Sequence, residues 1–195
     1  MKTFVGIMLA TTFLLLVGPS FVRQKIESKI GPIDLSADTL TESRITAVYG
    51  QGYIMVEKPE KQYAYFLPEE NIWLQLRYSH VLDGKLERTL RAILITRHKL
   101  CPKRFQPLSS LGKMMTSGGV QIGSSFGMVV KTYGKPTITI DVERDNTFAY
   151  LRETLKLKRG TVIRYLPSSS NGGDFFTEFA FDGKTLHSIL ISGVE

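Results

Sequence analysis

Val129-Val130-Lys131-Thr132-Tyr133-Gly134 is the second occurrence of a stretch that the chain first presents as Ile45-Thr46-Ala47-Val48-Tyr49-Gly50. A short segment of alternating apolar residues precedes each occurrence, at residues 33–36 and 120–123. Each copy ends with the tripeptide Asp-Gly-Lys, at residues 83–85 and 182–184. A largely apolar segment follows each tripeptide, at residues 92–95 and 188–191. This recurrence predicts two tandem units with the same architecture.

Each unit is predicted to contain one helix that ends at a tyrosine-glycine pair. Residues 39–42 read Thr-Leu-Thr-Glu and match a capping box at the first helix start, whereas Ser124 or Ser125 caps the second helix. Gly50 and Gly134 end the two helices because glycine accepts the left-handed backbone conformation. The predicted buried faces are Leu40, Ile45, Val48 and Tyr49 in the first helix, and Phe126, Val129, Val130 and Tyr133 in the second.

After each helix the hydrophobic period changes from near 3.6 to 2, which indicates strands. The candidate strands are residues 53–57, 62–67, 72–78 and 90–97 in the first unit, and 137–142, 147–151, 155–158, 161–166, 175–181 and 186–192 in the second. Short turns join them, so the pairing is predicted to be antiparallel. The fold class is therefore α+β, as two tandem repeats of a short helical segment on an antiparallel sheet of about four strands. Residues 155–166, as a hairpin, and the loop 168–173 are the expected extra residues of the second repeat.

The first residues read as an export sequence. One lysine precedes an apolar run from Phe4 to Val17, and Gly18-Pro19-Ser20 follows it, as in a secretory signal peptide cleaved after Ser20. A retained membrane anchor over residues 4–22 is the alternative. The expected location is therefore periplasmic or extracellular, or membrane-anchored with the globular part outside the cytoplasm.

The predicted organisation has four parts. Residues 1–20 are the signal peptide or anchor, 21–98 repeat one, 99–118 a basic linker and 119–195 repeat two. Residues 21–29 are compatible with a helix, and so are residues 109–115 in the linker. The charge of +7 and the single cysteine, Cys101, suit an exported protein without an internal disulfide. They do not indicate a nucleic-acid partner.

A family resemblance rests on residues 119–125, Gly-Val-Gln-Ile-Gly-Ser-Ser, and residues 129–136, Val-Val-Lys-Thr-Tyr-Gly-Lys-Pro. This pattern resembles the helix entry of bacterial exported proteins with the β-lactamase-inhibitor-protein-like fold. The resemblance implies a helical hairpin on a four-stranded antiparallel sheet, repeated in tandem in the inhibitor itself. It covers mainly the second repeat, and it carries over no contact residues and no catalytic residues.

No motif for enzyme chemistry or for a cofactor emerges from the sequence. His80, His98 and His187 lack metal-ligand spacing, and the serines at 168–170 lack the Gly-x-Ser-x-Gly elbow of a hydrolase. We therefore expect no catalytic residue, metal or cofactor, although a hydrolase with an unrecognised site stays an alternative.

The expected function is a non-enzymatic binding protein that recognises a protein or a cell-envelope component through a sheet surface. Strand aromatics and a basic hairpin are its candidate contacts, because Tyr and Trp often anchor interfaces. These residues are Tyr63, Tyr65, Trp73, Tyr78, Tyr150, Arg152, Lys156, Lys158 and Arg159. The alternative is a membrane-anchored envelope assembly or structural factor, held by residues 4–22.

Overall fold

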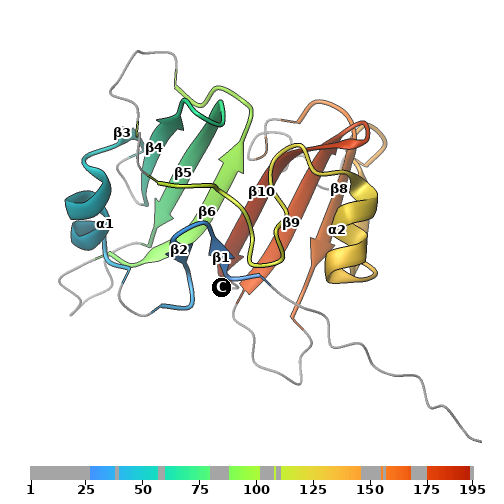
Figure 1. Ribbon diagram of the computed structural model, residues 1–195, viewed down its shortest axis with the longest axis horizontal. Coiled ribbons are helices and arrows are strands. Elements are labelled where there is room, and N and C mark those ends of the chain that lie inside the picture. Colours follow the sequence, from blue (N-terminus) through green and yellow to red (C-terminus); the bar gives the residue numbers. More distant parts are fainter. Residues whose placement is uncertain are drawn as a thin grey trace, which may run out of the picture.

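One antiparallel sheet of eight strands dominates the computed structural model (Figure 1). The structure describes residues 27–37, 40–56, 60–79, 88–101, 108, 111–145, 155, 157–167 and 175–193. The strands are β3 (Tyr53–Val56), β4 (Lys61–Leu67), β5 (Ile72–Tyr78), β6 (Leu90–Thr96), β7 (Ile138–Asp141), β8 (Thr161–Tyr165), β9 (Phe175–Asp182) and β10 (Thr185–Gly193). The predicted mixture of helices with an antiparallel sheet is confirmed.

The prediction of two four-stranded sheets is wrong, because β6 and β10 join all eight strands into one. The spatial order is β3-β4-β5-β6-β10-β9-β8-β7, so the last strand of each half meets at the centre. A free inner edge on either half would leave backbone donors and acceptors unpaired, and the β6–β10 ladder satisfies them. We call this ladder the seam.

The seam has an internal two-fold pattern. Leu94 lies opposite Leu190, and the flanking partners are Ile93 with Ile191 and Ile95 with Ile189. Because residues 92–95 correspond to 188–191 in the repeated sequence, Leu94 faces its own counterpart, and Ile93 and Ile95 each face the counterpart of the other. The two halves therefore meet as the subunits of an isologous dimer do.

Both predicted helices are present, α1 (Glu42–Tyr49) before β3 and α2 (Phe126–Tyr133) before β7. The Ser125 side chain accepts a hydrogen bond from the Met128 amide, as expected of a cap. Gly50 and Gly134 follow the helices with φ of 75° and 82°. The predicted face of α1 is wrong at Val48, which is 71% exposed. Ile45 and Tyr49, one turn apart, face the core instead.

A two-stranded hairpin, β1 (Lys29–Ile30) with β2 (Ile33–Asp34), comes before α1. Helix is therefore wrong for Lys29, and residues 27 and 28 are irregular. Glu27 is buried and accepts hydrogen bonds from the Lys29 amide, from the amide and hydroxyl of Ser117, and from the Tyr133 hydroxyl. These bonds fix an extended path. The expected linker helix is likewise absent from residues 111–115, where Met115 forms a β-bridge with Gln121.

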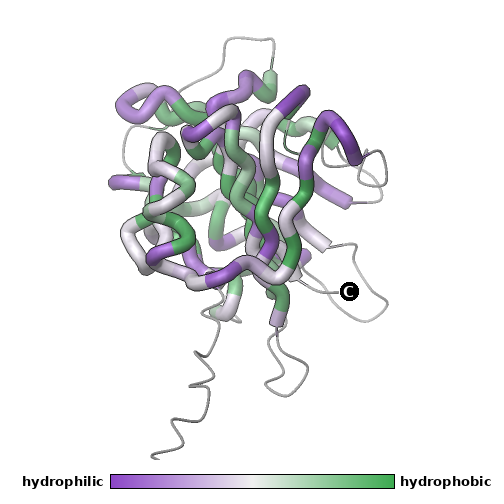
Figure 2. The backbone as a smooth tube through the Cα atoms, turned by 90° about the vertical axis from the view of Figure 1, so that its right-hand side faces the viewer, coloured by the Kyte–Doolittle hydropathy of each residue, from purple (hydrophilic) through white to green (hydrophobic). Residues whose placement is uncertain are grey.

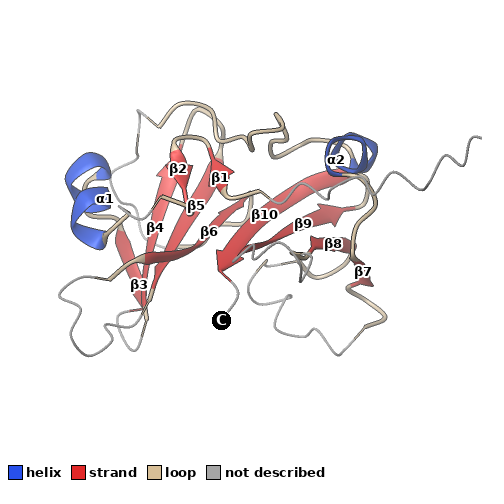
Figure 3. Ribbon diagram, turned by 90° about the horizontal axis from the view of Figure 1, so that it is seen from below, coloured by secondary structure: helices blue, strands red, loops and turns tan. Residues whose placement is uncertain are grey.

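The sheet divides the core into two layers. One face packs against α1, α2 and the β1–β2 hairpin, around Ile45, Val129 and the central Ile93 and Ile189. Figure 3 shows that the hairpin and α2 lie on the same side of the sheet. We call the opposite side the outer face. Figure 2 shows the hydrophobic residues gathered along the strands, with hydrophilic ones at the turns.

The β7–β8 connection departs from the prediction. Residues 155, 157 and 158 form no strand, and β8 pairs with β7 and β9 rather than with a 155–158 partner. Leu155 and Leu157 pack instead on the outer face of the second half, in contact with side chains rather than with a strand edge. The predicted strand at 147–151 and the loop at 168–173 lie outside the described residues.

Candidate partner-binding surface

The strand register shows which residues of the first half correspond to which residues of the second half. Starting from Leu94 and Leu190, the ladders relate Gln75 to Glu178 and Ala64 to Arg164. The same alignment relates Tyr65 to Tyr165. The hydroxyl of Tyr65 donates to the Gly50 carbonyl at 3.2 Å, and that of Tyr165 donates to the Gly134 carbonyl at 2.9 Å. Two equivalent bonds at the two helix ends support this correspondence.

The outer face of the second half is covered. Ile140, Val162 and Ala180 lie on three adjacent strands and are 2%, 0% and 0% exposed. Leu155 and Leu157 pack in the same apolar cluster and form its cover. The Leu155 carbonyl also accepts a hydrogen bond from the Ser188 hydroxyl at 3.3 Å. The long β7–β8 connection therefore seals this side.

Among the described residues, no segment covers the first half in the way that Leu155 and Leu157 cover the second. The β3–β4 connection spans residues 57–60, which is 60 − 56 = 4 residues, against 160 − 141 = 19 residues between β7 and β8. The counterparts of Val162 and Ala180 are Gln62 and Arg77, which are half-buried rather than buried. β3 is irregular between Ile54 and Val56, so Val56 is the partner of Gln62 where the second half has Ile140, and the half-buried Met55 lies beside it. We call Met55, Gln62 and Arg77 the open slot.

Polar groups replace the apolar floor in the open slot. Gln75, the neighbour of Gln62 on the same face, donates from its side-chain amide to the Gln62 side-chain oxygen at 2.7 Å. Arg77 Nε lies 3.7 Å from a Glu60 carboxylate oxygen, too far for a hydrogen bond. This buried Nε atom makes no hydrogen bond to any described residue. The slot thus holds a guanidinium group whose Nε has no hydrogen bond among the described residues.

Aromatic side chains lie beside the open slot on the outer face. Tyr53 and Phe66 are half-buried, and Phe66 packs against Trp73 with ring centroids 5.1 Å apart. Trp73 is buried against Cys101, with Leu100 packed at the edge of this small cluster. The first half therefore offers an apolar, aromatic wall next to a polar slot, a combination typical of recognition surfaces.

The structure places most of the predicted contact residues elsewhere. Tyr63, Tyr65 and Tyr78 are buried in the core beneath α1, so a partner does not reach them in this structure. Lys158 is exposed, and the exposed Arg159 lies 3.8 Å from Asp182. Tyr150, Arg152 and Lys156 lie outside the described residues. Only Trp73 belongs to the outer face of the first half.

Sequence reasoning missed the open slot because its members are chemically unlike. Met55 and Gln62 sit in short alternating segments that predict strands but not which face is left open. The available clue was the length difference between the two units, which marks where the second half carries an extra cover.

A second polar cluster lies at the start of α1. The Glu42 carboxylate accepts hydrogen bonds from Lys61 at 2.5 Å and from the Tyr63 hydroxyl at 2.6 Å, and Arg88 lies 3.5 Å away. Burial raises the pKa of Glu42, but the bonds from Lys61 and Tyr63 outweigh it and lower the pKa below its usual value. Lys61 has a raised pKa, chiefly through its bond to Glu42. Both groups stay charged, so this cluster ties α1 to β4.

His187 and Ser188 form the pair closest to hydrolase chemistry. His187 Nδ1 lies 2.8 Å from the Ser188 hydroxyl, which also bonds to Thr96 Oγ1 at 2.7 Å. Ser188 is fully buried under Leu155, so no substrate carbonyl reaches its oxygen in this structure. Burial lowers the pKa of His187, which favours the neutral imidazole. The pair stabilises the seam.

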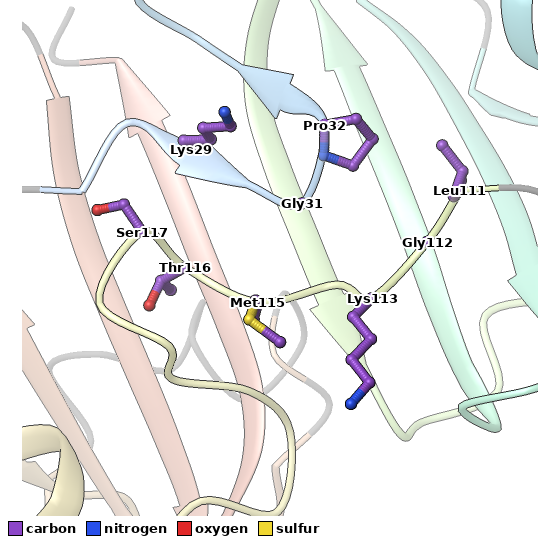
Figure 4. A pocket seen from close by; sticks show the side chains of 9 residues that line it. All are labelled: Lys29, Gly31, Pro32, Leu111, Gly112, Lys113, Met115, Thr116 and Ser117. Carbon is purple, nitrogen blue, oxygen red and sulfur yellow. The ribbon is translucent and has the colours of Figure 1, made fainter.

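A groove of about 380 Å³ lies between the β1–β2 turn and the linker. Figure 4 shows Lys29 on β1 and Pro32 in the turn after it, with Leu111 and Lys113 on the linker beside them. A Cβ at Gly31 would lie 2.9 Å from Met114 Sδ, so glycine permits the close approach of the turn to the linker. The two lysines give this groove a cationic rim.

Metal and membrane features were sought across the described residues. No three His, Cys, Asp or Glu side chains gather there in an arrangement that could hold a metal ion. No helix in that part of the chain combines the length and apolar character needed to cross a membrane.

Comparisons with known proteins add one distant likeness. No protein-family model matches the chain, and no curated protein sequence matches it. The fold is similar to the crystal structure of a DUF4309 family protein (YjgB) from Bacillus subtilis, at 12% identity and a TM-score of 0.44, over 82% of each chain. A likeness this distant carries no argument about activity, so the candidate function rests on the surface itself.

Proposed function

We propose that this chain is an exported, non-enzymatic binding protein that recognises a protein or a cell-envelope component through the outer face of its first half. The observation that carries the proposal is the asymmetry between the halves. Leu155 and Leu157 bury Val162 and Ala180 in the second half, whereas the counterparts Gln62 and Arg77 in the first half are half-buried, as is Met55 beside them. A folded chain that keeps such positions open has room there for another molecule.

The proposal includes an origin by tandem duplication. Each half has the order helix then four strands, and the seam is symmetric about the pair of Leu94 with its counterpart Leu190. The matching Tyr65 and Tyr165 hydrogen bonds add support. In this view one unit keeps its outer face free, and the resemblance to tandem β-lactamase-inhibitor-protein-like units is part of the same hypothesis.

The test is capture from an envelope fraction by immobilised full chain. Met55→Asp places a charge in the open slot, and Met128→Asp is its matched control because Met128 is 42% exposed on α2. We expect a partner that the wild type and Met128→Asp retain and that Met55→Asp loses. Equal recovery by both variants would place the binding surface elsewhere.

A membrane-anchored envelope factor is the second candidate, and the cationic groove favours it. Lys29 follows Val22, the end of the alternative anchor, by seven residues, and Lys113 shares its groove. Intact mass and fractionation of the expressed protein distinguish the two candidates. A soluble product that begins near Phe21 fits the exported binding protein, and a full-length product in the membrane fraction fits the anchored factor.

A further inference from the structure

We infer that the open slot accepts an extended segment of a partner protein, one that carries two apolar side chains two residues apart with an acidic residue beside them. This inference rests on the proposed function, because it names the occupant of the same surface.

The second half supplies the first argument, because it holds a cover of this kind. Leu155 and Leu157 are two residues apart, and an extended chain turns such residues to the same side. A helix would turn them apart, since its neighbours on one face are three or four residues apart. The Ser188 hydroxyl holds the cover by its backbone, at the Leu155 carbonyl.

The floor of the open slot suits apolar side chains along one strip. Met55 lies at the irregularity of β3 and packs against the apolar cluster of Ala64, Trp73 and Cys101, and it stays half-buried, whereas Ile140 on the covered half is 2% exposed. Methionine adapts its shape to different apolar partners, so it accepts a segment from another molecule more easily than a branched side chain does. Two apolar side chains laid over β3 and β4 would complete the burial of Met55.

The charge of the open slot supplies the argument for an acidic residue. Arg77 stands where the second half has Ala180, and its buried Nε makes no hydrogen bond to the described residues. Its ion-pair partner within the described part of the chain, Glu60, is 3.7 Å away, and the two side chains are 32% and 39% exposed. Exposed pairs of this kind are weak. The Arg77 side chain is 32% exposed as a whole, so a partner carboxylate can approach it as a second ion-pair partner, and the chain's net charge of +7 favours an acidic partner.

The experiment is selection of phage-displayed random dodecapeptides on the immobilised full chain, followed by fluorescence anisotropy with the selected peptides. We expect selected peptides to share two apolar residues two apart with a neighbouring Asp or Glu. Arg77→Gln should weaken their binding roughly tenfold or more, because a charge-assisted hydrogen bond is lost. Met55→Asp should abolish it, and Met128→Asp should leave it unchanged. Circular dichroism melting curves would verify that each variant folds.

Each other outcome overturns the inference in a recognisable way. Selected peptides that are basic, that lack the spaced apolar pair or that bind Arg77→Gln as well as the wild type would exclude this occupant. If no peptide is enriched while Met55→Asp still loses the captured envelope partner, the surface stands and its occupant is not an extended segment. If capture is also independent of Met55, the proposed function fails together with the inference.

Discussion

Replacing Tyr78 by phenylalanine should make the protein more stable. The Tyr78 side chain is fully buried beneath α1, and its hydroxyl has no hydrogen-bond partner among the described residues. Burial raises the pKa of this hydroxyl far above its usual value, so it is buried as a neutral and unsatisfied group. The Tyr63 ring packs edge-on against it at 5.8 Å, a contact that phenylalanine would keep.

The magnitude follows from the cost of an unmade hydrogen bond. A buried polar group without a partner costs about 1–3 kcal/mol, so Tyr78→Phe should raise the free energy of unfolding by about 1 kcal/mol. In a protein of this size that corresponds to a Tm higher by about 2–4 °C. Tyr165→Phe is the matched control, since its hydroxyl donates to the Gly134 carbonyl. Its loss should lower the free energy of unfolding by about 1 kcal/mol.

Urea unfolding of the three proteins, followed by far-ultraviolet circular dichroism, measures both changes. The expected result is a pair of shifts in opposite directions from the same chemical change. A Tyr78→Phe protein that is less stable than the wild type by as much as Tyr165→Phe would refute the reasoning. It would mean that the Tyr78 hydroxyl has a bonding partner.

Three further predictions concern stability. Arg164→Met should lower the free energy of unfolding by about 3–5 kcal/mol in urea titrations, because it leaves the fully buried Glu178 carboxylate without its ion-pair partner. Burial lowers the pKa of His187, so near pH 6 the unfolded chain binds more protons than the folded one. The free energy of unfolding should therefore fall as the pH drops below 6.5, and His187→Gln should reduce that fall in melting curves. Gly160→Ala should give a strongly lowered Tm or insoluble protein, because its φ is 117° and the added Cβ would lie 2.0 Å from the Phe181 carbonyl oxygen.

The helix positions and most strands could be predicted from the sequence because local rules determine them. Alternating segments such as residues 72–78 became strands, and the tyrosine-glycine pairs ended the helices where expected. The seam was missed although a clue to it was present. Residues 92–95 and 189–191 are apolar without alternation, which is typical of strands buried on both faces, and such strands lie inside a sheet rather than at an edge.

The candidate site was far less predictable than the strands. Tyr63 and Trp73 lie on neighbouring strands and looked alike as interface anchors, yet one faces the core beneath α1 and the other faces outward. Which face of the sheet carries the helices depends on tertiary packing. Alternation of apolar and polar residues divides a strand between two faces, but it does not determine which face the helices cover. The open slot could not be read from residue types, since its character comes from the absence of a cover like Leu155 and Leu157.

The same feature accounts for both the closed half and the open half. Two units joined by an isologous seam would have equal outer faces if their connections were equal in length. The additional residues between β7 and β8 break that equality, and they bury Val162 and Ala180 while Gln62 and Arg77 stay half-open. The polar replacements are consistent with this difference, because a floor of valine and alanine without a cover would leave apolar surface in water. Gln62 and Arg77 tolerate water, and Arg77 keeps a donor for a partner. The polar character of the open slot is thus consistent with the difference in cover between the described parts of the two halves, and this difference is the physical basis of the proposal that the first half carries the binding surface.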